Sequence, residues 1–78
     1  MPPARNTEFH LDADGFPITG SRWRHHSGRV YVILMMTNVE EGRQDEFPTT
    51  VVYQGPNGKR YSRALTEFMQ PGRYVPEA

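Results

Sequence analysis

The chain contains no cysteine, has no long hydrophobic run and carries no net charge at pH 7. The absence of cysteine excludes disulfide bonds and thiolate metal sites, so a chain of 78 residues depends for its stability on an apolar core or a partner. The longest apolar run, residues 30–36, is far shorter than the roughly 20 residues of a membrane-spanning helix. Because the start of the chain also lacks the apolar segment of a signal peptide, we expect a soluble, cytoplasmic protein with no membrane partner.

Charged residues are unevenly distributed along the chain although their sum is zero. Arg and Lys predominate in residues 20–38 and 57–74, whereas Glu and Asp cluster in residues 40–46 and near the start. We therefore expect the molecule to have a basic side and an acidic side. The balanced total disfavours dedicated binding of duplex DNA, whose affinity comes largely from neutralising many phosphates.

Four segments have the β-branched and aromatic composition of strands. The first two are separated by Ser27-Gly28, which predicts a hairpin, and the second is apolar on both faces, which predicts a central strand. A loop rich in acids then leads to the third segment, TTVVYQ. Asn57-Gly58 joins that segment to the fourth, KRYSRAL, and this pair is the one best suited to a type I′ turn.

Alternation of side chains along the strands defines the predicted core. Leu65, Phe68 and Met69 have helical spacing, and Pro71-Gly72 limits that helix to a single turn. The residues that we expect to be buried are Val30, Val32, Leu34, Val51, Tyr53, Leu65 and Phe68.

Residues 1–19 are rich in proline and turn signals, and we interpret them as an extended N-terminal arm preceding a domain at residues 20–78. The loosely alternating apolar residues of the arm allow it to dock on the domain or on a partner. Short strands joined by tight turns in so short a chain favour an all-β fold, a small barrel of about four to five strands with one short helical turn.

The strand segments resemble the DUF1653 family of small bacterial and phage proteins. The resemblance covers about residues 22–69, with Ala64 at a position where the family tends to have proline. It implies an SH3-like small barrel and brings no known activity. The matching positions are Trp23, Arg24, His25, Gly28, Tyr31, Ile33, Val51, Val52, Tyr53, Gly58, Tyr61, Arg63, Leu65 and Phe68.

Patterns typical of catalysis or metal binding are weak. His25 and His26 are neighbours, and neighbouring strand residues point to opposite faces, so we do not expect them to share a metal ion. The DADG stretch at residues 12–15 lacks the glutamate of a calcium loop and predicts an Asp-Gly turn. The chain has neither a nucleophile elbow nor a glycine-rich phosphate loop. We therefore expect no cofactor and no enzymatic activity.

Arginine interleaved with aromatic residues is the strongest candidate for a functional site. This composition has three interpretations: a protein interface, a platform that stacks single-stranded nucleic acid, or a structural border of the core. We favour a protein partner, with single-stranded nucleic acid as the alternative, and expect the first and fourth strands to lie side by side and form one surface. A continuous positive face would favour nucleic acid. The candidate binding residues are Trp23, Arg24, His25, Arg60, Tyr61 and Arg63.

Overall fold

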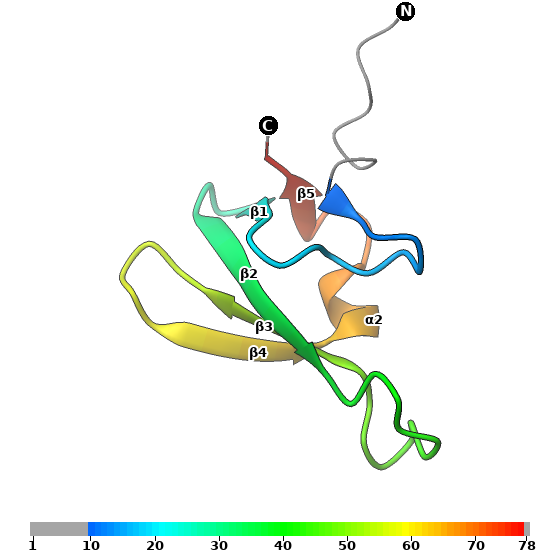
Figure 1. Cartoon of the computed structure of the whole chain (residues 1–78). Coiled ribbons are helices and arrows are strands. Elements are labelled where there is room, and N and C mark those ends of the chain that lie inside the picture. Colours follow the sequence, from blue (N-terminus) through cyan, green and yellow to red (C-terminus); the bar gives the residue numbers. More distant parts are fainter. Residues whose placement is uncertain (1–9, 78) are drawn as a thin grey trace, which may run out of the picture.

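The computed structural model describes residues 10–77 as one antiparallel sheet with a short helix (Figure 1). The order of the strands across the sheet is β4-β3-β2-β1-β5. The all-β prediction is confirmed. The elements are β1 (Arg22–His25), β2 (Val30–Thr37), β3 (Thr50–Gln54), β4 (Arg60–Ala64), α2 (Leu65–Phe68) and β5 (Tyr74–Pro76).

Both predicted hairpins are present, because β1 pairs with β2 and β3 pairs with β4 in antiparallel register. β2 pairs with strands on both sides, as expected for a central strand, and α2 is a single helical turn. The prediction that β1 lies next to β4 is wrong, since β2 and β3 separate them. Within residues 10–77 no ladder joins the edge strands β4 and β5, so the SH3-like barrel stays a prediction.

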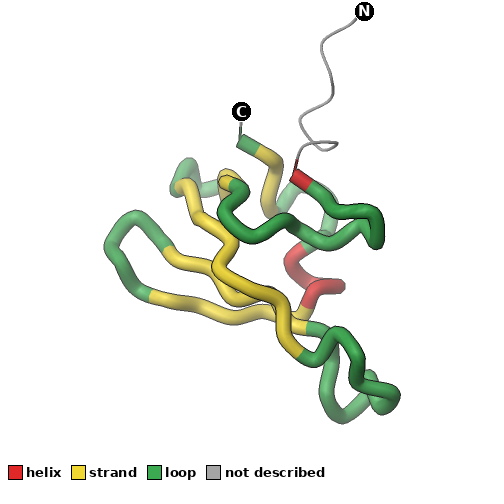
Figure 2. Tube along the Cα trace, in the orientation of Figure 1, coloured by secondary structure: helices red, strands yellow, loops and turns green. Residues whose placement is uncertain are grey.

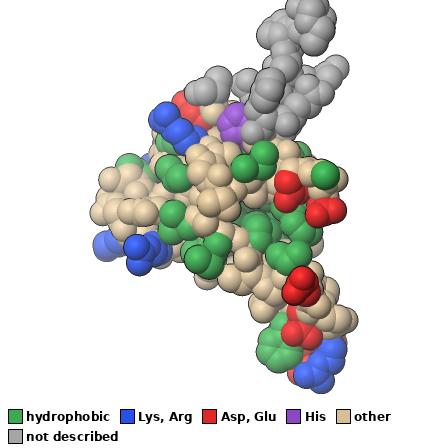
Figure 3. All heavy atoms as spheres, in the orientation of Figure 1, with side chains coloured by type: hydrophobic (Ala, Val, Ile, Leu, Met, Phe, Trp, Pro, Cys, Tyr) green, Lys and Arg blue, Asp and Glu red, His purple; other side chains and the backbone are tan. Residues whose placement is uncertain are grey.

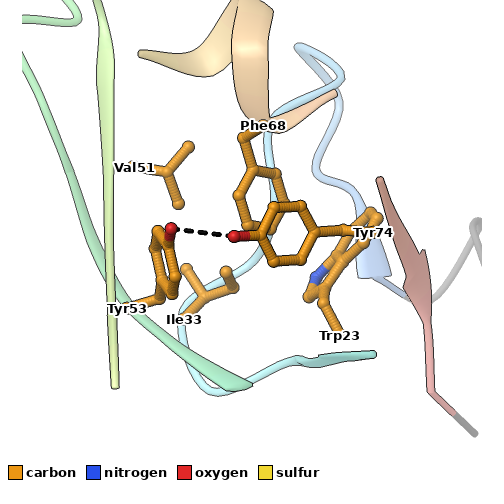
Figure 4. Packing of buried hydrophobic residues seen from close by; sticks show 6 residues of the cluster. All are labelled: Trp23, Ile33, Val51, Tyr53, Phe68 and Tyr74. Carbon is orange, nitrogen blue, oxygen red and sulfur yellow. Dashed lines mark hydrogen bonds between the residues drawn. The ribbon is translucent and has the colours of Figure 1, made fainter. Parts of the chain in front are cut away.

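The core lies on the concave side of the sheet, where α2 packs (Figure 4). Val51, Tyr53 and Phe68 are buried as predicted, and Leu65 is only partly buried. Three aromatic and aliphatic side chains complete the buried cluster: Trp23, Ile33 and Tyr74. The ring of Phe68 stacks on that of Tyr74, with centroids 4.2 Å apart and planes 12° apart.

The predicted inward face of β2 is wrong. Ile33 is fully buried, whereas Val32 is exposed and Leu34 only half-buried. The register of β2 against β3 shifts between Ile33 and Met35, and a bulge of this kind reverses the alternation of side chains beyond it. Met36, past the bulge, packs against the core.

The described part of the predicted arm, residues 10–19, folds back onto the sheet. Asp12 accepts hydrogen bonds at Oδ1 from the backbone N–H groups of Asp14 and Phe16, each 2.9 Å long, which confirms the Asp-Gly turn. Pro17 is buried, and Leu11 packs against the core. The rest of the arm, residues 1–9, lies outside the described residues.

The loop between β2 and β3 extends away from the sheet at the end opposite the β3–β4 turn (Figure 2). Gln44 organises it, because its Nε2 donates to the carbonyls of Asn38 and Glu41, 3.0 and 2.8 Å away, and its Oε1 accepts from the N–H of Thr49. Apolar side chains occupy the middle of the face in Figure 3, and Lys and Arg lie at its margins. Among residues 10–77, no helix has the length and hydrophobicity to cross a membrane.

Candidate functional site between two hairpin turns

The β1–β2 and β3–β4 turns have the same backbone geometry. In the first, His25 N–H donates to the Arg29 carbonyl and Gly28 N–H donates to the His25 carbonyl, both at 2.8 Å. Gly28 has a φ of 96°, in the left-handed region that favours glycine. This is a type I turn followed by a one-residue bulge at glycine.

The second turn repeats this pattern at residues 55–59. Gly55 N–H donates to the Lys59 carbonyl, and Gly58 N–H donates to the Gly55 carbonyl, both at 2.9 Å. Gly58 has a φ of 82°, whereas Asn57 has a negative φ, so the predicted type I′ turn is wrong. Pro56 explains the difference, because its ring fixes φ near −65° at the position where a type I turn needs that value.

A pocket of about 230 Å³ lies between the two turns and is called the turn pocket below. It is lined by Arg29, Tyr31, Pro56, Asn57 and Tyr61. The rings of Tyr31 and Tyr61 meet nearly at a right angle, with centroids 5.9 Å apart and planes 83° apart. Asn57 Nδ2 donates to the Tyr61 hydroxyl over 3.1 Å, which fixes the orientation of that wall.

Gly55 allows the tyrosine walls to lie close to the turn. A Cβ atom at this position would lie 3.0 Å from Tyr31 Cε2 and 3.2 Å from Tyr61 Cε2. Distances this short force the neighbouring rings to move. The absence of a side chain at Gly55 therefore sets the shape of the turn pocket.

A polar network centred on the Tyr53 hydroxyl lies next to the turn pocket, because the Tyr53 ring contacts the rings of Tyr31 and Tyr61. The hydroxyls of Tyr53 and Tyr74 lie 2.9 Å apart (Figure 4). Arg63 Nε donates to the Tyr53 hydroxyl over 3.3 Å. Burial and the hydrogen bond to Tyr53 raise the pKa of Tyr74 to about 12. The hydrogen bond to Tyr53 also raises the pKa of Arg63 further above its ordinary value.

His25 lies at the border of this network. Its Nδ1 accepts a hydrogen bond from the Ser27 N–H over 3.1 Å, so the neutral ring carries its proton on Nε2. Burial lowers the pKa of His25, and nearby His26, Arg73, Arg63 and Arg29 lower it further. The imidazole is therefore held in its neutral form in a basic environment.

The structure brings together three of the predicted site residues, His25, Tyr61 and Arg63. They lie on the concave side of the sheet, and Tyr31 connects the first two through edge contacts with both rings. Tyr31 was absent from the predicted site. Its signal was its alternation with Ile33 on one face of β2, but its contact with Tyr61 depends on the order of the strands, which the sequence left open.

The other three predicted site residues lie elsewhere. Trp23 is 2 % exposed and packs against Phe68 in the core, so it is a core residue. Arg24 alternates with Trp23 onto the convex side, where its Nε lies 3.6 Å from a Glu77 carboxylate oxygen. Arg60 alternates with Tyr61 onto the same convex side. Arg24, Arg60 and Arg63 therefore form no continuous positive face.

The side chains of His25 and His26 do not point to opposite faces of a strand, so the reason given for not expecting a shared metal ion is wrong. β1 ends at His25 and His26 lies in the turn, so the two rings are adjacent, with centroids 4.0 Å apart. Across residues 10–77, however, no group of three or more His, Cys, Asp or Glu side chains is placed to hold a metal ion. A second hollow, of about 460 Å³, borders the acidic loop next to Met36 and is more open than the turn pocket.

Comparison of the chain with protein-family models, curated proteins and solved structures finds no match. The resemblance to DUF1653 therefore stays a prediction. Conclusions about function depend on the geometry of the site.

Proposed function

We propose that this chain is a cytoplasmic, non-enzymatic binding module whose partner is another protein, and that the partner docks at the turn pocket. The observation that carries the proposal is the fixed pair of tyrosine walls, Tyr31 and Tyr61, beside an exposed arginine, Arg29. Tyrosine and arginine are among the residues that contribute most to binding energy in protein interfaces. A pocket shaped before binding also lowers the entropy lost on association.

Two of the chain's arginines favour a protein over nucleic acid as the ligand. Arg24 is close to Glu77, and Arg63 is engaged by Tyr53 and by a Glu67 carboxylate 3.3 Å away. Arg24 and Arg63 are therefore less available to contact phosphates, and single-stranded nucleic acid binding needs a row of free cations.

Single-stranded nucleic acid is the second candidate ligand. Arg29, Arg63 and Arg73 lie close enough to His25 to lower its pKa, and no acidic group contributes to that shift. A basic environment next to an exposed tyrosine ring, here that of Tyr61, is a feature of proteins that stack bases.

Capture from lysate followed by affinity measurement tests the protein proposal. The bait is compared with Arg29→Ala and with Arg22→Ala, a matched exposed arginine on the convex side, in nuclease-treated lysate. The captured protein is then purified and its Kd measured. We expect Arg29→Ala to weaken binding roughly tenfold and Arg22→Ala to leave it unchanged.

Two results contradict the proposal. The first is equal binding by the Arg29→Ala and Arg22→Ala variants. The second is that the protein is captured only when nuclease treatment is omitted, and that the chain binds oligothymidylate with an affinity that falls steeply between low and physiological salt. That result establishes the nucleic-acid alternative.

A further inference from the structure

β4 is an open edge of the sheet beside the turn pocket. Within residues 10–77 it pairs with β3 on one side and with no strand on the other. Two flanking hydrogen bonds, Gly55 N–H to the Lys59 carbonyl and Leu65 N–H to the Thr49 carbonyl, fix the phase of the ladder. Since antiparallel pairs alternate, Tyr61 and Arg63 bond toward β3.

The intervening residues of β4 therefore direct backbone groups away from the sheet. These groups are the N–H and carbonyl of Arg60 and of Ser62 and the N–H of Ala64, and none forms a hydrogen bond with residues 10–77. Arg60 and Ser62 are exposed, so a second chain can reach this edge. Free groups at every second residue are the template for adding a strand.

The other edge strand, β5, is a poor template. It has three residues and ends at Pro76, which has no N–H to donate. β4 has five residues, contains no proline and keeps an unbroken register with β3. Strand addition is therefore favoured at β4.

The charges along β4 select the incoming strand. Lys59 and Arg60 lie at its start and Arg63 near its end, and Glu67 is the acidic residue that pairs with Arg63. Two copies of β4 placed side by side bring the positive charges of both strands to one seam, and neither strand supplies an acidic residue to offset them. A strand with acidic side chains instead complements this edge.

We propose that β4 pairs with an extended, acidic segment of a partner protein, which becomes the sixth strand of the sheet. The inference rests on the proposed protein-binding function and adds to it the chemistry of the ligand. Backbone hydrogen bonds to Arg60, Ser62 and Ala64 hold the segment, a mode of binding known as β-augmentation. Side chains of the segment on the concave side then lie next to Tyr61, a wall of the turn pocket.

Synthetic peptides of defined sequence test this pairing. The probe is a nine-residue peptide of alternating Glu and Val, and its control replaces each Glu by Lys. We expect the acidic peptide to bind roughly tenfold or more tightly than the basic one, and to slow amide exchange at Arg60, Ser62 and Ala64 in NMR spectra. Equal affinity of the two peptides, or unchanged exchange at those amides, overturns the inference.

A pair of variants at Ser62 separates backbone pairing from charge attraction. Ser62→Pro removes the outward N–H, and proline is tolerated at such positions on an edge strand, whereas Ser62→Ala keeps the N–H. We expect peptide binding to be lost in Ser62→Pro and retained in Ser62→Ala, and equal binding by both refutes the pairing. If Ser62→Pro fails to fold, two N-methylated versions of the acidic peptide are used in its place, one methylated at every odd-numbered amide and the other at every even-numbered amide. We expect methylation of one set to abolish binding and methylation of the other set to leave binding unchanged. Equal effects of the two sets refute the pairing.

Failure of this inference is distinguishable from failure of the proposed function. If the acidic peptide leaves β4 unchanged while the captured partner still shifts the resonances of Arg29 and Tyr61, strand addition is wrong and the binding function stands. If the chain alone forms oligomers as its concentration rises, with protected Ser62 amides, the occupant is a second copy and the proposed partner is wrong.

Discussion

Replacing Tyr74 by Phe tests the buried polar network. The Tyr53 hydroxyl has two partners, Tyr74 at 2.9 Å and Arg63 at 3.3 Å, so the Tyr74→Phe variant leaves it bonded to Arg63. We expect a loss in unfolding free energy of about 1 kcal/mol, the net value of one hydrogen bond. Tyr53→Phe leaves both Tyr74 and Arg63 without this partner, so we expect a larger loss of about 2 to 3 kcal/mol.

The pH dependence of the Tyr74→Phe variant provides the more specific test. A tyrosine in the unfolded chain has a pKa of about 10, and burial raises the pKa of Tyr74 to about 12 in the folded protein. Because the folded state favours the neutral phenol, this contribution to stability is fully present below pH 10 and is lost as the pH rises toward 12. By pH 11 the parent should have lost on the order of 1 kcal/mol more than Tyr74→Phe.

Urea unfolding at pH 8 and pH 11 measures this difference. Trp23 is the only tryptophan and is buried in the core, so its fluorescence reports unfolding. If the parent and Tyr74→Phe lose the same stability between the two pH values, the pKa of Tyr74 is not raised in the folded protein and this reasoning is refuted.

Three further predictions concern the register, the turn and His25. Ile33→Ala should lower the unfolding free energy by about 2 to 5 kcal/mol and Leu34→Ala by clearly less, and the reverse order in urea unfolding would place the bulge wrongly. Gly58→Val should lower the free energy of unfolding by about 1 to 3 kcal/mol, because the φ of Gly58 is 82°. Gly42 has open space around it and no positive φ, so the control variant Gly42→Val should melt within a few degrees of the parent. Because the pKa of His25 is lowered in the folded protein, its contribution to stability is present above pH 6.5 and is lost as the pH drops below that value. An NMR titration of the His25 ring should give a midpoint below 6.5. A midpoint above 6.5 contradicts the basic environment.

The sequence was sufficient to predict local features of the fold. β-Branched residues predicted the strands, Ser27-Gly28 and Asn57-Gly58 marked both hairpins, and Pro71-Gly72 limited the helix. Each signal acts over a few residues, so it holds in any tertiary arrangement. β5 was not located, because it has three residues, the last of which is Pro76, and so carries little strand signal of its own.

Local sequence patterns could not predict which face of β2 packs against the core. Residues 30–36 are apolar on both faces, so alternation alone does not say which face is buried. The bulge after Ile33 then changes the phase within the strand, and its position depends on the pairing with β3. Pairing partners are decided by the tertiary structure.

The same dependence on tertiary structure explains why the predicted site residues lie on two different sides of the sheet. Arg24 and Arg63 have similar sequence neighbours, each close to an aromatic residue, yet Arg24 lies on the convex side and Arg63 on the concave side. Arg63 holds Tyr53 in the core through Nε and contacts Glu67 through Nη1, so replacing it reduces stability as well as any binding. Arg29 forms no ion pair or side-chain hydrogen bond within residues 10–77 and lines the turn pocket, so its replacement reports on recognition alone. The residue that best tests binding is therefore the one whose side chain the fold leaves unused.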